Sequence, residues 1–115
     1  MSEDTRLPTG LWIEAQLRQL TAQATPYYIV NKGAYYSGTV LLKLNMLENG
    51  CKILSQIRDL NGQLGWFSAL KEETVAEAEA DAYIRRAVER DPDVWVIEIE
   101  DRQGQNPFAG KILTE

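Results

Sequence analysis

The sequence contains no histidine and a single cysteine, Cys51. Without histidine, the Ser/His and Cys/His mechanisms of nucleophilic catalysis are absent. One cysteine allows neither an internal disulfide nor a tetrahedral Cys/His zinc site. We therefore expect a reducing, cytoplasmic compartment, no bound metal and no cofactor.

Long apolar runs are also missing. Nowhere do about 18 consecutive apolar residues occur, which is the length that a helix needs to span a bilayer. Residues 1–10 have no apolar segment of the kind found in a signal peptide. The sequence therefore predicts no membrane association.

Basic residues are fewer than acidic ones, twelve against seventeen, and the net charge is -5. A surface of this sign repels the phosphate backbone of nucleic acids. The pairs Tyr27–Tyr28 and Tyr35–Tyr36 could stack on bases, with Lys32 close by. The alternation of a strand makes a core position the simpler role for one tyrosine of the first pair, and a nucleic-acid partner is disfavoured.

The length of 115 residues and the 44% hydrophobic content suit one domain with one core. We expect a single domain over residues 1–115, with residues 1–6 and 108–115 as frayed tails. No repeat, linker or low-complexity tract divides the chain.

Two segments have the periodicity of amphipathic helices. The first begins with Thr9 as its N-cap and places apolar residues at Ile13, Leu17 and Leu20. The second begins with Thr74 and Glu77 in the spacing of a capping box and runs to about Arg90, before Pro92. In this second helix, Glu77 and Asp81 are expected to face outward.

Segments rich in β-branched, aromatic and aliphatic residues predict the strands. Short turns at Asn49–Gly50 and Asn61–Gly62 connect consecutive strands of an antiparallel meander. The predicted strands are 27–30, 39–47, 51–60, 63–70 and 94–100.

These elements predict an α+β domain. Their order is α-β-β-β-β-α-β, and the sheet is expected to have about five mainly antiparallel strands. Each helix has one apolar stripe, so both helices are expected on one face of the sheet, as a two-layer sandwich. The other face of the sheet is then open.

Strand alternation predicts which polar side chains occupy the open face. They lie among the aliphatic residues Leu41, Leu47 and Leu54. A mixture of charges and aliphatic groups is typical of a protein contact surface, although a solvated sheet face with cross-strand ion pairs is the more ordinary explanation in an antiparallel sheet. The candidate binding residues are Lys43, Asn45, Arg58, Glu98 and Glu100.

Two further patterns suggest chemistry that their spacing does not support. The acids around the last strand, from Asp91 to Asp101, could hold a divalent ion or form a carboxylate pair. Asp91 and Asp93 instead flank a proline that ends a helix, and Asp101 points away from Glu98 and Glu100. The Gly33–Gly38 segment lacks the Lys and Ser/Thr of a phosphate loop, so it is interpreted as a turn. No catalytic residue is predicted.

The chain resembles a family of short bacterial proteins, known chiefly from alphaproteobacteria and defined as a domain of unknown function. The most specific element of the resemblance is Asp91 to Arg102. It extends over Leu11–Trp12, Gly38, Val40 and Lys43–Asn45, and over the second helix with Glu77, Ala78 and Asp81 to Ile84. The resemblance implies a cytoplasmic domain that stands alone, and it brings no activity, substrate or catalytic residue with it.

The sequence favours a small non-enzymatic interaction module that binds another protein or its own copy through the open sheet face or an edge strand. The alternative is a small-molecule-binding protein or enzyme. Its pocket would lie between the first helix and the sheet, near Trp12, Trp66 and Trp95, although core packing also explains these tryptophans.

Overall fold

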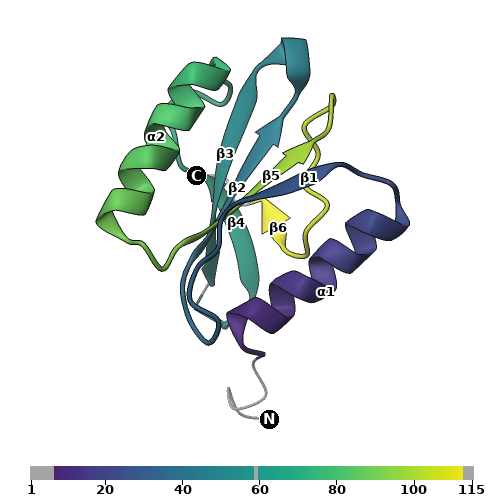
Figure 1. Cartoon of the computed structure of the whole chain (residues 1–115), viewed down its shortest axis with the longest axis vertical. Helices are drawn as coiled ribbons and strands as arrows, with labels where there is room; N and C mark the ends of the chain where they lie inside the picture. The colour runs from purple at the N-terminus through teal and green to yellow at the C-terminus, as the bar shows by residue number, and fades with distance from the viewer. Residues whose placement is uncertain (1–6, 59, 113–115) are drawn as a thin grey trace.

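A computed structural model describes residues 7–58 and 60–112, and its elements follow the predicted order (Figure 1). The α+β class is confirmed. Within the described residues, no helix is long and apolar enough to cross a membrane. The elements are α1 (Thr9–Ala22), β1 (Tyr27–Asn31), β2 (Val40–Asn45), the short 3-10 turn η2 (Leu47–Asn49), β3 (Cys51–Arg58), β4 (Leu64–Ser68), α2 (Glu77–Arg90), β5 (Trp95–Glu100) and β6 (Lys111–Ile112).

The strands form one mixed, mainly antiparallel sheet in the order β1-β5-β2-β3-β4-β6. Strands β2, β3 and β4 are the predicted meander. The first strand does not belong to it, because β5 lies between β1 and β2, antiparallel to β1 and parallel to β2. The short β6 pairs in parallel with β4 at the opposite edge.

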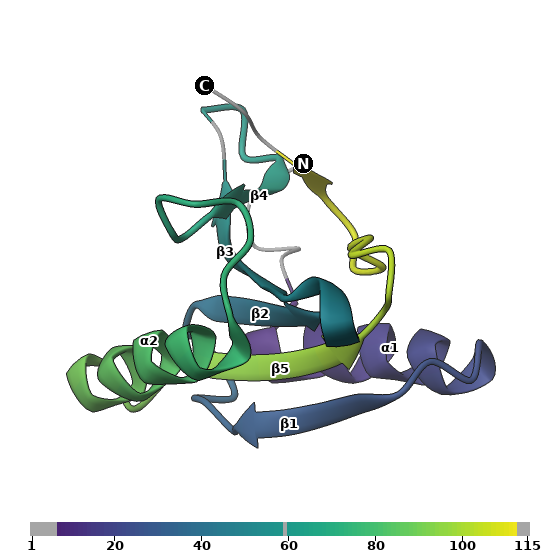
Figure 2. The ribbon, with the colours of Figure 1, turned by 90° about the horizontal axis from the view of Figure 1, so that it is seen from above.

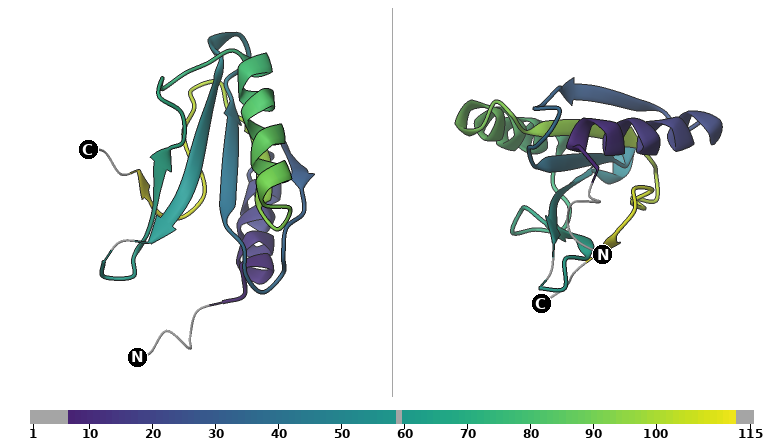
Figure 3. Two further views of the ribbon diagram at one scale, coloured as in Figure 1. Left: turned by 90° about the vertical axis from the view of Figure 1, so that its left-hand side faces the viewer. Right: turned by 90° about the horizontal axis from the view of Figure 1, so that it is seen from below.

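The two helices lie on opposite faces of the sheet, so the expectation of two helices on one face is wrong. In Figure 2, seen from above, α2 lies in front of β5 and α1 lies behind it. In the right-hand view of Figure 3, seen from below, α1 lies in front and α2 behind. Ile13, Leu17 and Leu20 of α1 pack on the side of the sheet where Leu42 points. Ala80, Ile84 and Ala87 of α2 pack on the side where Leu41 points. Neither face of β2 is left open, and β5 is buried or half-buried along its whole length.

Strand β2 explains why both faces are covered, because all six of its residues are buried. Val40, Leu42 and Leu44 belong to the core under α1, whereas Leu41 belongs to the core under α2. A strand buried on both faces is nearly continuous in apolar residues, in contrast to the alternating pattern of a half-exposed strand. The two polar residues of β2, Lys43 and Asn45, therefore need internal partners.

The C-terminal segment is attached to the domain by the buried Phe108 and by the pairing of β6 with β4, which corrects the expectation of a frayed tail over residues 108–112. Phe108 is buried and makes edge-on contacts with Trp12 and Trp66. The indole Nε1 of Trp66 donates a hydrogen bond of 2.9 Å to the carbonyl of Ala109. The remaining expected tails, residues 1–6 and 113–115, lie outside the described residues.

The two-sided core predicts that neighbouring residues of β2 are equally sensitive to truncation. We expect Leu41→Ala and Leu42→Ala each to lower the free energy of unfolding by about 2–5 kcal/mol, because each removes a buried side chain from a packed core. Urea denaturation measures both. Ile57→Ala, at a 42% exposed position, is the control and should cost less than about 1 kcal/mol. A loss of that smaller size for Leu41→Ala would contradict a core under α2.

Candidate functional site

The ammonium of Lys43 lies in the middle of the sheet and is surrounded by carboxylates. Lys43 is 2% exposed. Its Nζ lies 2.7 Å from Oδ1 of Asp81, 2.8 Å from Oε2 of Glu77 and 3.4 Å from Oε1 of Glu98. Two of these acids come from α2 and the third from β5. We call these residues, together with Asn45, the Lys43 cluster.

Asn45 connects the acids of the cluster to one another. Its Nδ2 donates to Oε2 of Glu98 at 2.9 Å and to Oε2 of Glu77 at 3.4 Å. Its Oδ1 accepts the backbone N–H of Leu47 at 2.9 Å, so both ends of the amide are occupied. The side chain of Asn45 therefore holds the first turn of α2, the end of β2 and β5 in one hydrogen-bonded network.

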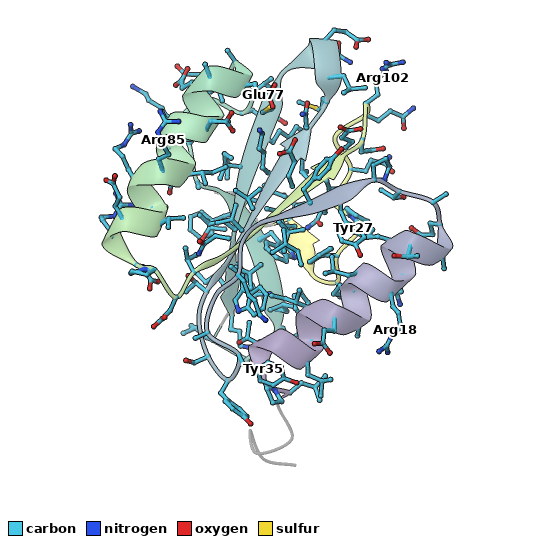
Figure 4. The ribbon with its side chains drawn as sticks, viewed as in Figure 1. Arg18, Tyr27, Tyr35, Glu77, Arg85 and Arg102 are labelled. Atoms are coloured by element: carbon cyan, nitrogen blue, oxygen red, sulfur yellow. The ribbon has the colours of Figure 1, made fainter. Side chains whose placement is uncertain are left out.

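Backbone register brings these side chains together. Lys43 is directly opposite Glu98 in the parallel β2–β5 pair, and opposite Ile53 in the β2–β3 pair. Glu77 and Asp81 are four residues apart, so they lie one above the other on one side of α2. Figure 4 labels Glu77 at the beginning of α2, in the first turn, and Arg85, two turns further on, at the outer side of the helix. Only the first half of α2 contributes charges to the cluster.

Glu77 does not form the predicted capping box with Thr74. The helix begins at Glu77 itself, its N-cap is Ala76, and no side chain caps it. The carboxylate of Glu77 binds Lys43 instead, and Asp81 does the same, so neither points freely outward as expected. The sequence signal that could have revealed this was a lone lysine in an apolar strand together with two acids at helical i,i+4 spacing.

The cluster holds Lys43 in its charged form. Burial disfavours the charge, but hydrogen bonds to Asp81 and Glu77 and the attraction of Glu98 outweigh it and raise the pKa of Lys43 above its ordinary value. A lysine with a raised pKa is a poor base and a poor nucleophile, because both roles require the neutral amine. One cation faces three carboxylates, and the cluster stabilises the packing of α2 on the sheet.

Cys51 lies beside the cluster, opposite Asn45 in the β2–β3 pair, and is buried. Burial is the main cause that raises the pKa of its thiol. The charge of Lys43 lowers this pKa, and the surrounding carboxylates raise it. The thiolate is the reactive form of cysteine. Cys51 is therefore a packing residue at neutral pH.

The five candidate binding residues do not form one surface. Lys43, Asn45 and Glu98 are in contact, and Glu100, directly opposite Asn45 across the β2–β5 pair, is half-buried on the same face. Arg58 is on the other face, since it shares the phase of Leu54, which packs in the core under α1. Its guanidinium binds the carbonyl of Gly62 in the β3–β4 turn. The face expected to be open is covered by α2.

The tryptophans of the alternative pocket are core residues. Trp66 is fully buried, and Trp12 packs against it with ring centroids 6.4 Å apart. Trp95 is buried, and its Nε1 donates to the carbonyl of Ala34 at 2.8 Å, in the Gly33–Gly38 turn. Within the described residues, Trp12, Trp66 and Phe108 pack against one another, and all three tryptophans belong to the core under α1. Core packing is therefore the role that the structure gives them.

The acids near β5 serve local structure. Oδ1 of Asp91 accepts the N–H of Asp93, and Oδ2 of Asp101 accepts the N–H of Gln105, as is typical of turns that acids stabilise. Over the described part of the chain, no three His, Cys, Asp or Glu residues are grouped so that they could hold a metal ion.

Comparison with known proteins identifies the domain. The family model described as "Protein of unknown function (DUF1491)" matches residues 7–109. The chain belongs to the DUF1491 family. The resemblance that the sequence suggested is thereby confirmed, and membership assigns no activity to the Lys43 cluster.

Solved structures of DUF1491 proteins share this fold. A crystal structure of a family protein from Caulobacter crescentus CB15 is 30% identical, covers 93% of this chain and 99% of its own, and has a TM-score of 0.81. An NMR structure of a family protein from the same organism is also 30% identical, with coverages of 94% and 97% and a TM-score of 0.78. A solution structure of an A. tumefaciens protein, 20% identical over 84% of this chain and 87% of its own, shares the fold with a TM-score of 0.68. No curated protein matches the chain.

The cluster of this DUF1491 protein predicts a large loss of stability when its cation is removed. Lys43→Met keeps most of the aliphatic volume but leaves three carboxylates facing one another. We expect the free energy of unfolding to fall by about 2–4 kcal/mol, somewhat less than for a fully buried pair because Glu77 and Asp81 are half-exposed. Urea denaturation at pH 7 measures this. The control Lys71→Met removes an exposed lysine and should cost under about 0.5 kcal/mol; equal losses in the two variants would contradict a stabilising cluster.

The raised pKa of Lys43 predicts how this stabilisation depends on pH. The folded protein holds the Lys43 proton more tightly than the unfolded chain, where the pKa is about 10.4. The contribution is therefore complete below about pH 10 and is lost as the pH rises further, by about 1.4 kcal/mol per pH unit. The measurement is the difference in unfolding free energy between the native sequence and Lys43→Met from pH 7 to 11.5. A difference that grows above pH 10.4 would have the wrong sign.

Proposed function

We propose that this domain is a small, non-enzymatic interaction module whose docking element is the edge strand β1 and whose partner is a second copy of the chain. The observation that carries the proposal is that β1 is an edge strand with exposed apolar residues. This strand is at one end of the sheet order, and Figure 2 shows it as the outermost strand. Tyr28, Ile29 and Val30 are three consecutive apolar residues that are each about half-exposed there.

An edge strand carries backbone N–H and C=O groups that can pair with another strand. Proteins commonly protect such edges with charges, prolines or bulges. The residues of β1, from Tyr27 to Asn31, include neither a charge nor a proline. The feature of β1 that disfavours pairing with another chain is an irregularity in its register with β5, between Ile29 and Asn31. Within the part of the chain that the structure describes, the opposite edge, β6, covers two residues. Of the two edges, β1 therefore offers more backbone for pairing.

Charges at the two ends of β1 favour a second copy as the partner. An antiparallel pair of β1 strands centred near Ile29 places Lys32 of one copy next to Pro26 of the other. The backbone N–H of Glu100 donates to the carbonyl of Pro26, so Glu100 lies at that end. Each exposed Lys32 then approaches a half-buried Glu100 across the two-fold axis. Between the two paired β1 strands, no like charges come opposite one another, because residues 27–31 carry no charge.

The chemistry of the Lys43 cluster supports a role without catalysis. Lys43 is held charged, its carboxylates are hydrogen-bonded, and the thiol of Cys51 is buried with a raised pKa. A free, buried cysteine also suits the reducing cytoplasm, where we place the protein. The sheet face that the sequence analysis expected to be open is covered by α2, so we assign the interaction to the edge strand.

The oligomeric state tests the proposal. We expect sedimentation velocity on the full chain to show a monomer–dimer equilibrium, which Ile29→Lys shifts toward monomer by at least about tenfold in Kd, because a charge is buried in the pair. Ile57→Lys is the matched control, since Ile57 is a strand isoleucine of similar exposure, 42% against 48%, away from β1. A monomer at all concentrations, or equal effects of both variants, would overturn the proposal.

A charge exchange tests the orientation of the two copies. Lys32→Glu and Glu100→Lys should each weaken the dimer about threefold to fivefold, as expected for an exposed ion pair. The double variant should restore it, because the exchanged charges again face each other. Losses that simply add in the double variant would contradict the antiparallel arrangement.

A further inference from the structure

A pocket of about 510 Å³ lies between the sheet and the segment that follows β5. Its floor is formed by the buried side chains of Leu44 and Leu54, on the face that also carries α1. No residue of α1 lines it. Figure 2 shows the C-terminal segment, in yellow, leaving the end of β5 and reaching β6 near β4. The volume is within the range of small-molecule sites.

The covering segment is held at both ends, so the pocket has defined walls. At one end, the N–H of Asp101 donates to the carbonyl of Asn45, and the N–H of Gly104 donates to the carbonyl of Asp101. At the other end, Phe108 packs against Trp12 and Trp66, and the N–H of Ala109 donates to Oε1 of Gln16 at 3.1 Å. Gln105 and Asn106 stand between these anchors and line the pocket.

Lys52 supplies a positive charge at the wall of the pocket. Its side chain is 24% exposed, and its Nζ lies 3.7 Å from Oε2 of Glu73, which is beyond hydrogen-bond distance. Glu73 is 81% exposed, and an ion pair of this kind contributes little. An anionic group in the pocket can therefore replace Glu73 as the partner of Lys52 at small cost.

Asn106 adds a hydrogen-bond donor with no partner in the described part of the chain. Its Oδ1 accepts the N–H of Phe108 at 2.9 Å, which fixes the orientation of the amide. The buried Nδ2 is left unpaired. An unsatisfied buried donor costs about 1–3 kcal/mol, so an oxygen that reaches it from the pocket is favoured.

We infer that this pocket binds a small organic anion with an apolar body and one carboxylate. The carboxylate pairs with the ammonium of Lys52, and a small displacement of the turn at Asn106 lets its Nδ2 donate to the same group or to a second oxygen. The apolar body packs on Leu44, Leu54 and Ile112. The site is on the opposite face of the sheet from the Lys43 cluster, and it does not depend on pairing at β1.

Titration with octanoate, monitored by ¹H–¹⁵N NMR on the full chain, tests the inference. We expect saturable shifts of the amides of residues 52, 54, 68, 105 and 106. Octan-1-ol has the same apolar chain without the charge and should bind at least about fivefold more weakly, because it offers no carboxylate to Lys52. Octylamine, with the opposite charge, should bind more weakly still. Equal affinities for octanoate and octan-1-ol, or shifts spread over other surfaces, would overturn the inference.

Two variants locate the binding site. Lys52→Met should weaken octanoate binding about fivefold to tenfold and leave octan-1-ol binding unchanged, whereas Lys71→Met, which removes an exposed lysine outside the pocket, should change neither. Ser68→Trp places a large side chain at an exposed position of the pocket wall, leaves the buried residues of the floor unchanged, and should abolish binding of both compounds. Full affinity in the folded Ser68→Trp variant would overturn the inference.

Discussion

The burial of one lysine charge constrains the whole arrangement. An ammonium in the middle of a sheet that is covered on both faces costs several kcal/mol unless charged partners compensate it. For Lys43 the partners come from α2 and from β5, which are distant in sequence from β2. The position of α2 on its face and the insertion of β5 between β1 and β2 both satisfy this one requirement. Packing of Ala80, Ile84 and Ala87 then completes the contact of the helix.

The same requirement specifies the register of the parallel pair. A shift of β5 by one residue would turn Glu98 to the opposite face and bring Ile97 or Ile99 toward Lys43. Asn45 makes the penalty larger, because it would lose its bond to the same carboxylate. Parallel pairing of strands separated by two further strands and a helix is slow to form, since the loop between them is long. A polar network that accepts only one register gives specificity that the interchangeable aliphatic residues of β2 and β5 cannot give.

The local elements were largely predictable, but their assembly was not. Residue composition, apolar periodicity and the Asn–Gly turns indicated both helices and the strands from β1 to β5, because these signals depend on neighbours in sequence. The two-layer arrangement was wrong, although the sequence held a signal against it: Val40, Leu41, Leu42 and Leu44 are too continuous for a strand with one open face. Strand order depends on pairing between β2 and β5, some fifty residues apart, which no local pattern encodes.

The candidate site was likewise predicted only as far as local patterns determine it. Strand phase correctly placed Lys43, Asn45 and Glu98 on one face, whereas Arg58 was assigned to the wrong face when the third strand was aligned with the second. Glu77 and Asp81 were missed because the Thr74–Glu77 spacing fits a capping box and a solvated helix face equally well. These interpretations and the observed ion cluster differ in whether a buried cation lies within reach of the two acids, and that depends on the tertiary fold.

With α1 and α2 covering the two faces of β2 and the Lys43 cluster saturated, the two recognition sites that we propose are the edge strand β1 and the pocket beside the C-terminal segment. They are separated by the sheet order itself, because β5 lies between β1 and the strands β2, β3 and β4 that face the pocket. A second copy paired at β1, as we propose, would extend the sheet away from that pocket and leave its opening accessible. By holding β5 between β1 and β2, the Lys43 cluster also keeps the two proposed recognition elements apart, so that occupation of one would leave the other accessible.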